Sequence, residues 1–288
     1  MFGVSSMTAP LKKVGLMKPG DALLEADPLV WHYSSAFDPN KIHAIHKSFV
    51  DLLTQSDIEI LWMPEDDKGI ADSIFTYDAS FMTNFGAILM SPGKPLRKGE
   101  QNIHRKFYQE NNIPIIGEIK GQGIAEGGDI FWLDEKTLVI GRGFRTNQYG
   151  VDQLISILGP FDIKVHAYDL PVFKGEKACL HMMSLISLVD TNKAIVHTPL
   201  LPAGLFKLLK EKGFELIEAP IREFNSSSTL SINVLAISPG ECIMLSGLPR
   251  TSEALTNSGV NVKFLDGEAL CIGCEGGPTC LTRPILRE

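Results

Sequence analysis

Hydrophobic and polar positions along the chain follow one repeated order. Two short apolar stretches joined by a tight polar turn are followed by an amphipathic stretch with helical spacing, and then by a third apolar stretch. One copy runs through residues 73–119, a second through 129–170, a third through 185–220 and a fourth through 231–266. The pattern therefore predicts a repeated ββαβ unit.

The two ends of the chain supply the parts of a fifth unit. Residues 11–18 form an apolar stretch, and residues 41–57 have the spacing of an amphipathic helix that leads into another apolar stretch at 58–64. The last apolar stretch, within 276–285, has no partner in its own repeat. If it pairs with 11–18, five units close into a ring without a free sheet edge. We therefore predict the α/β fold class, as a five-bladed pseudo-symmetric propeller of ββαβ repeats.

Composition and charge narrow the class of protein. The 288 residues are 44% hydrophobic, enough for a substantial core, and no linker divides them, so we expect residues 1–288 to form a single domain. The net charge of -7 and the absence of a basic cluster argue against a nucleic-acid partner. No apolar stretch approaches the roughly 20 residues that cross a bilayer. We expect a soluble, cytoplasmic protein without a membrane partner, and a homo-oligomer stays open.

Four of the five cysteines lie in the last fifth of the chain. An odd number so arranged is not typical of a disulfide framework, and we expect reduced thiols. Cys271 and Cys274 form a CxxC pair, which with Cys280 leaves a metal or redox module open. Because a zinc site usually takes two such pairs and the sequence has one, we predict no metal. Cys179 and Cys242 are assigned to the core.

Residues with chemical potential recur next to the first strand of successive units. They are Asp72, Asp78, Glu126, Asp129, His181 and Cys280. A thiol attacks an electrophilic carbon when it loses its proton and when a neighbouring group protonates the leaving group. Carboxylates bind a planar guanidinium through paired hydrogen bonds. The set points to a small-molecule guanidino substrate, held by Asp78 and Glu126 against Cys280.

Five separated motifs strengthen this interpretation. They are YDASF with GKPLRKGE, EGGD, GRGFRTNQYG, CLHMMS and GGPTC, in that order. Together they resemble the guanidino-group-modifying superfamily, the penteins, which includes dimethylargininases, arginine deiminases and amidinotransferases. The resemblance covers nearly the whole chain beyond residue 60. It implies a catalytic domain in which a cysteine attacks the guanidinium carbon, ammonia or an amine leaves, and water hydrolyses a covalent thiouronium intermediate, without a cofactor.

The resemblance also assigns roles residue by residue. It implies that Cys280 is the nucleophile and His181 the acid/base, and that Asp78 and Glu126 hold the guanidinium. Positions that match contacts to the amino-acid end of the substrate are Asp72, Arg97 and Arg145. Asp129 is expected to support the site or its loop, and Arg142 is a second candidate for binding a substrate carboxylate.

Two positions depart from the pattern. Met183 stands where deiminases and amidinotransferases usually carry a third carboxylate clamp, and the segment 181–184 is instead similar to dimethylargininases. A methylated or otherwise alkylated guanidine is therefore favoured over free arginine. Tyr77 stands where dimethylargininases generally have Glu, which leaves the substrate itself open.

Several alternatives stay open on the sequence alone. The favoured function is hydrolysis of methylarginine or arginine to citrulline and an amine or ammonia, and the alternatives are amidino transfer and a non-catalytic binding protein of the same shape. Asp78 has a structural alternative, which is a buried carboxylate paired with an arginine. The loop that shapes the pocket is expected within residues 18–40.

Overall fold

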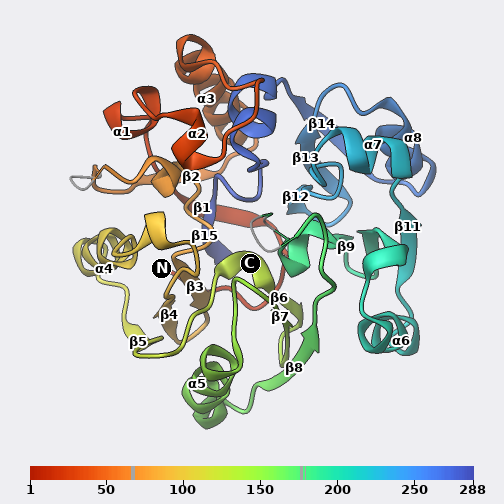
Figure 1. Ribbon diagram of the computed structural model, residues 1–288. Helices are drawn as coiled ribbons and strands as arrows, with labels where there is room; N and C mark the ends of the chain where they lie inside the picture. Colours follow the sequence, from red (N-terminus) through yellow and green to blue (C-terminus); the bar gives the residue numbers. More distant parts are fainter. Residues whose placement is uncertain (66–68, 176–177, 179) are drawn as a thin grey trace.

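Five three-stranded sheets are arranged in a ring in the computed structural model, which describes residues 1–65, 69–175, 178 and 180–288 (Figure 1). In each sheet the middle strand is antiparallel to one neighbour and parallel to the other. A parallel pair needs a crossover connection, and a helix supplies it in every unit. The predicted five-bladed α/β propeller is confirmed.

Four units follow one another along the chain in the predicted order. The first consists of β3 (Ser80–Thr83), β4 (Gly86–Leu89), α4 (Gln101–Glu110) and β5 (Ile115–Glu118). The second consists of β6 (Ile130–Asp134), β7 (Thr137–Arg142), α5 (Gln148–Leu158) and β8 (Lys164–Asp169). The third consists of β9 (Ile186–Asp190), β10 (Lys193–Val196), α6 (Ala203–Glu211) and β11 (Glu215–Glu218). The fourth consists of β12 (Leu235–Ser238), β13 (Glu241–Leu245), α8 (Pro249–Asn257) and β14 (Asn261–Leu265).

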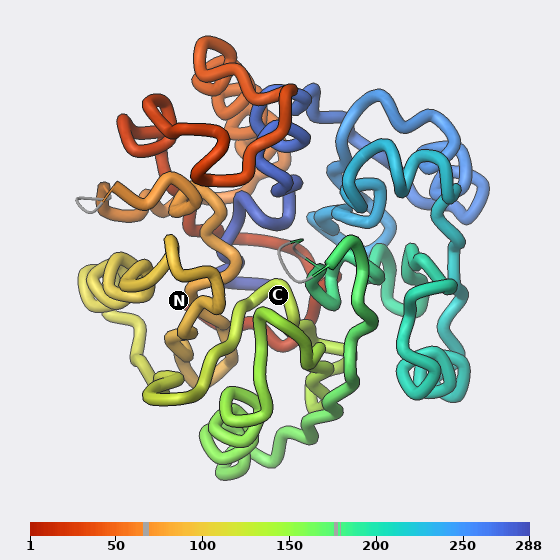
Figure 2. The backbone as a smooth tube through the Cα atoms, viewed as in Figure 1, coloured from red at the N-terminus to blue at the C-terminus, as the bar shows by residue number. Residues whose placement is uncertain are grey.

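The two ends of the chain share the fifth sheet. It consists of β15 (Arg283–Arg287), β1 (Leu11–Leu16) and β2 (Glu59–Trp62), with α3 (Pro39–Thr54) as the crossover. β15 is antiparallel to β1, and Figure 2 shows the red and blue ends of the chain side by side. The last strand thus closes the ring as predicted, and it removes the free edge that β1 would otherwise present.

Local sequence signals explain where the long helix α3 begins and which face it buries. The Asp38 side chain accepts the Asn40 N–H, and proline follows at the first helical position. Ile42, Phe49 and Leu53 recur at helical spacing and are fully buried. None of the described helices has the length and hydropathy that a membrane span requires.

The strand β3 begins later than the hydrophobic pattern predicts. The apolar run at 73–81 predicts a strand, whereas β3 begins only at Ser80, and Ala71–Ile74 is a 3-10 helix. Hydrogen bonds between units hold the irregular backbone before β3, among them Tyr77 N–H to the Cys280 carbonyl at 3.1 Å. This segment is apolar because it is buried, not because it pairs in a sheet. As a result, Asp78 lies in a loop rather than in a strand.

Closure of the ring should contribute strongly to stability, and Ile285 tests it. Its side chain is fully buried in β15, and its carbonyl accepts the Gly3 N–H at 2.8 Å. We expect Ile285→Ala to lower the free energy of unfolding by about 3 kcal/mol, because truncation leaves a cavity in the closing sheet. Urea denaturation measures the change. The matched control is Lys12→Ala on the exposed face of β1, which should change stability by less than about 0.5 kcal/mol; equal effects would contradict the prediction.

Candidate active site

One cavity lies between the loops that precede the innermost strands. Its walls contain six of the predicted site residues, Asp72, Asp78, Arg97, Arg145, His181 and Cys280, and also Cys274 of the CxxC pair. They come from segments more than 200 residues apart in the chain, so only closure of the ring brings them together. The site has the thiol, the imidazole and the carboxylate that thiol chemistry on a cation requires.

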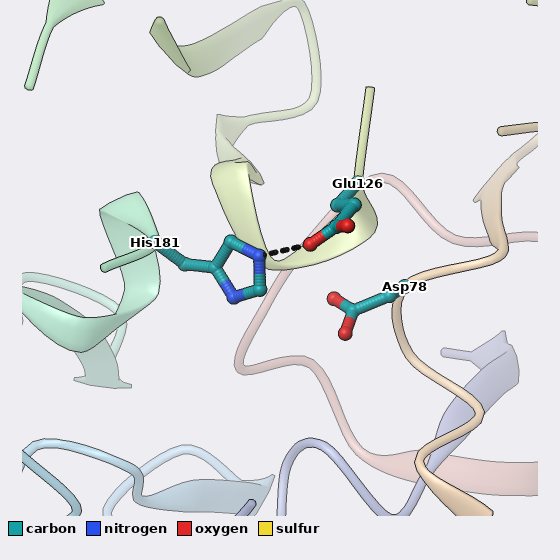
Figure 3. A group of neighbouring side chains, drawn as sticks. All are labelled: Asp78, Glu126 and His181. Atoms are coloured by element: carbon teal, nitrogen blue, oxygen red, sulfur yellow. Dashed lines mark hydrogen bonds and ion pairs between the residues drawn. The ribbon is translucent and has the colours of Figure 1, made fainter. Parts of the chain in front are cut away.

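Glu126 is fully buried behind His181 (Figure 3). Its Oε2 lies 2.6 Å from His181 Nε2, and Arg145 Nη1 donates to both carboxylate oxygens at 3.0 Å. Burial alone would raise the pKa of Glu126, but Arg145 and His181 hold it well below its usual range. The Glu126 carboxylate, which was expected to hold the guanidinium, therefore orients the imidazole of His181. It is not among the described residues that line the cavity.

The two glycines of the EGGD motif allow this close packing. A Cβ on Gly128 would lie 2.4 Å from His181 Nδ1 and 2.9 Å from Asp78 Oδ1, and one on Gly127 would lie 2.1 Å from the Tyr77 carbonyl oxygen. The Gly128 N–H donates to Asp78 Oδ1 at 2.9 Å. The motif is thus both a turn and a part of the site, because only glycine lets its backbone come this close to His181, Asp78 and Tyr77.

Asp129 supports the histidine segment from behind. It accepts the Met182 N–H at 2.9 Å and the Thr146 hydroxyl at 2.7 Å, and it is fully buried. Burial raises its pKa to about 6. Arg142 lies away from the cavity, where its Nε donates to Asp169 at 2.6 Å.

Asp78 has the buried arginine partner that the sequence left open. Arg97 Nη1 donates to Asp78 Oδ2 at 2.5 Å, and the same guanidinium binds both oxygens of Glu100, at 2.6 and 2.7 Å. A further donor of Arg97 is used by the Phe75 carbonyl at 3.0 Å. Arg97 therefore borders the cavity, as expected of a substrate contact, but its donors are largely used in holding Asp78 in place.

Cys280 lies beside the amide of Asn233, which is not among the predicted site residues. Asn233 Nδ2 donates to Cys280 Sγ at 3.1 Å, and the Thr279 N–H donates to Asn233 Oδ1 at 2.9 Å, which sets the orientation of the amide. Burial raises the pKa of Cys280 to about 11; Asp78 raises it as well, whereas His181 lowers it. One signal could have found Asn233, because it lies two residues before β12, just as Asp78 lies two residues before β3.

The segment at 18–40 shapes the mouth of the cavity, as predicted. It contains the short helices α1 (Asp21–Leu24) and α2 (Pro28–Trp31), and Trp31 and His32 belong to the cavity wall. The Tyr33 hydroxyl donates to Asp72 Oδ1 at 2.8 Å, and Lys94 Nζ lies 2.5 Å from Asp72 Oδ2. Neither Tyr33 nor Lys94 is among the predicted site residues. Lys94 lies in the GKPLRKGE motif, but the resemblance assigned a role there to Arg97 alone.

A second, smaller cavity reaches Cys280 and His181 from another side. Its wall includes Met183, Leu230 and several hydroxyl groups. Tyr77 borders this second cavity rather than the first, and its ring centroid lies 4.2 Å from the Arg283 guanidinium carbon. The phenol that replaces a carboxylate thus packs against a buried cation.

The CxxC cysteines are not grouped with other metal ligands. Among the described residues, the His, Cys, Asp and Glu side chains close enough to share an ion are Asp78, Glu126 and His181, whose ligand atoms lie within 4.8 Å of one another. Cys271 is buried, and burial raises its pKa well above its usual value. Cys242 is fully buried in the core, as predicted, and Cys179 lies outside the described residues.

Comparison with known proteins agrees with the geometry. A profile of the arginine deiminase family matches residues 69–208. N(G),N(G)-dimethylarginine dimethylaminohydrolase from Pseudomonas aeruginosa is 29% identical over 238 residues, which are 82% of this chain and 85% of that protein. The uncharacterized protein YkgA from Bacillus subtilis is 24% identical over 282 residues, which are 96% of this chain and 92% of its own length.

Solved structures show the same fold. The Pseudomonas aeruginosa enzyme complexed with citrulline aligns with a TM-score of 0.77 and 24% identity, covering 97% of this chain and all of that one. SxtG, an amidinotransferase from Microseira wollei, aligns with a TM-score of 0.79 and 15% identity, covering 100% of this chain and 97% of that one. These matches confirm the predicted resemblance to the guanidino-group-modifying superfamily, the penteins.

The raised pKa of Cys280 predicts a slow reaction of the free protein with iodoacetamide at neutral pH, because only the thiolate attacks. The alkylation rate of Cys280 should rise with pH, and the midpoint of this rise should lie at the pKa of the thiol, about 11. Asn233→Leu removes a donor to the thiolate and should raise this midpoint by roughly one pH unit. Mass spectrometry of the Cys280 peptide measures the rate, with Asn257→Leu at an exposed position as the control. An unchanged midpoint in Asn233→Leu would show that the amide does not stabilise the thiolate.

Proposed function

We propose that the protein hydrolyses a C–N bond of a guanidino substrate through a covalent intermediate on Cys280. One observation carries the proposal: Cys280, His181 and Asp78 line one cavity, and Glu126 holds the imidazole at 2.6 Å. A nucleophile, an oriented acid/base and an anion in one cavity match attack on a cationic carbon. The relatives named for arginine and dimethylarginine hydrolysis support the same class of reaction.

Binding of the substrate would activate the thiol. A guanidinium held by Asp78 places a positive charge beside Sγ, and an opposite charge at this distance favours the thiolate. This offsets the effect of burial, which keeps Cys280 protonated in the free protein. The nucleophile is then formed mainly when the cation is present, so that a buried thiol with a raised pKa is compatible with catalysis.

The chemical steps follow from this arrangement. The thiolate attacks the guanidinium carbon, and the tetrahedral adduct collapses as His181 donates a proton to the leaving ammonia or amine. The product of this step is a thiouronium on Cys280. His181 then removes a proton from water, which attacks the same carbon, and the C–S bond breaks to give a ureido product and the free thiol. His181 is an imidazolium after it takes the thiol proton and before it protonates the leaving group, and again after it deprotonates water. Glu126 stabilises the imidazolium on both occasions, and the last proton returns to the thiolate when the C–S bond breaks.

The second cavity supports a substrate with an alkylated nitrogen. Met183 and Leu230 bring apolar surface next to Cys280 and His181, and Met183 stands where deiminases usually carry a third carboxylate; Glu275 is the carboxylate among the described residues of this wall. A methyl group on the leaving nitrogen would lose its hydration without losing a salt bridge. We therefore propose methylated or otherwise alkylated arginine, rather than free arginine, as the preferred substrate class.

Amidino transfer is a second candidate, because the same cavity also carries hydroxyl groups that could orient an amine. They belong to Ser184, Ser228 and Thr229. An amine in place of water would release the thiol and form a new guanidine. Products distinguish the two reactions, since hydrolysis yields a ureido compound whether or not an amine acceptor is added.

The direct test is turnover of arginine, its methylated forms and agmatine by the native protein and by Cys280→Ser. We expect ureido product and released amine from the native protein, and a loss of at least about a thousandfold in the variant, because a hydroxyl is a far weaker nucleophile. Cys242→Ser in the core is the matched control and should keep its activity if it folds. No turnover of any guanidine by the folded native protein would refute the hydrolase.

Substrate preference should depend on Met183. We expect Met183→Asp to raise the ratio of kcat/KM for arginine to kcat/KM for methylarginine by about tenfold or more. An unsubstituted nitrogen can donate a charge-assisted hydrogen bond to the new carboxylate, whereas a methylated nitrogen has fewer N–H groups to donate. Met183→Leu keeps an apolar side chain and should leave the ratio nearly unchanged. An equal fall for both substrates in Met183→Asp would mean that this position does not contact the leaving nitrogen.

A further inference from the structure

The end of the cavity at α2 contains a cation that none of the reaction steps uses. Lys94 lines the cavity, and its side chain is only 14% exposed. Its Nζ lies 2.5 Å from Asp72 Oδ2 and 3.0 Å from the Trp31 carbonyl oxygen, and 5.0 Å from the centroid of the Trp31 ring. A lysine ammonium has three donors, and acceptors among the described residues account for two of them.

Asp72 is fully engaged at the same end of the cavity. Lys94 binds one of its oxygens and the Tyr33 hydroxyl binds the other, at 2.8 Å. An ammonium group on a substrate would meet a carboxylate whose charge Lys94 already balances, and it would lie next to the like charge of the lysine. Asp72 therefore does not act as a free anion here, although its position matches one that contacts the amino-acid end of a substrate.

The arginines near the cavity are less suited to take up a carboxylate. Arg97 is 4% exposed, and its donors are used by Glu100, Asp78 and the Phe75 carbonyl. Arg145 donates to both oxygens of Glu126 and so holds the carboxylate that orients the histidine. If either arginine turned to a substrate, a buried carboxylate would be left without its cation, which is costly.

We propose that Lys94 anchors a carboxylate at the far end of the substrate, and that the α-amino group of that substrate is dispensable. The substrate class is then an ω-guanidino carboxylate, with or without an amino group. This inference rests on the proposed hydrolysis at Cys280, and it adds which end group the cavity selects. A substrate carboxylate accepts a charge-assisted hydrogen bond from the remaining N–H of the Lys94 ammonium, whereas a terminal ammonium on the substrate meets a like charge.

The backbone of Lys94 also links this end of the cavity to the reaction centre. The N–H groups of Gly93 and Lys94 both donate to Glu126 Oε1, at 2.8 and 3.2 Å. The other oxygen of Glu126 is the one next to His181. The spacing between the end-group anchor and the catalytic histidine is thereby fixed by one carboxylate, which should favour one length of substrate.

The test compares four substrates that differ only in the end group: arginine, desaminoarginine, agmatine and butylguanidine. Each carries the nitrogen substituent that the native protein turns over fastest. We expect desaminoarginine to reach the kcat/KM of arginine within about threefold, and agmatine to fall below both by about tenfold or more. In Lys94→Met, kcat/KM for arginine and desaminoarginine should fall by about tenfold, mainly through KM, while butylguanidine stays unchanged.

Two further variants keep the result interpretable. Lys94→Arg retains the charge and should restore the preference for a carboxylate, and Lys98→Met removes an exposed lysine of the same segment and should have no effect. An equal fall for butylguanidine and desaminoarginine in Lys94→Met, or a native preference for agmatine, overturns the anchor but leaves the hydrolase intact. If the native protein turns over no guanidine at all, the proposed function is lost and the anchor with it.

Discussion

The buried carboxylate of Glu126 is the interaction on which the site depends. It receives hydrogen bonds from the backbone after β4, from Arg145 after β7 and from His181 before β9, so it joins three units of the ring. A carboxylate with no exposed surface is stable only when its oxygens are fully paired with donors and cations. The positions of the histidine, of the cavity wall and of the neighbouring blades therefore depend on one another.

The same principle shapes the rest of the cavity. Arg97 pairs with Asp78 and Glu100 in a buried group, in which burial raises the pKa of Glu100 to about 7, and Lys94 pairs with Asp72 at the other end. Before a cationic substrate binds, the buried carboxylates of the site are paired with lysine and arginine side chains of the protein itself. A buried carboxylate without such a partner would be costly. A substrate guanidinium therefore binds to carboxylates that already have cationic partners. The selectivity of the site for its substrate then depends on the donors and acceptors that these pairs leave unused.

The thiol lies in a different environment from the carboxylates. Burial keeps Cys280 protonated in the free protein, while Asn233 offers the sulfur one neutral donor. A hydrogen bond from an uncharged amide stabilises the thiolate, but not enough to deprotonate Cys280 in the free protein. A positively charged substrate would supply the remaining stabilisation.

The sequence by itself determined the five ββαβ repeats, the closure of the ring by the last strand and the identity of six residues of the cavity wall, because hydrophobic periodicity and motif order can be read along the chain. Only the tertiary structure decided how the charges pair. It placed Glu126 behind His181, gave Asp78 the partner Arg97, and brought Asn233 to Cys280. Which partner a buried charge receives depends on distances between loops of different units, and those distances exist only once the ring has closed.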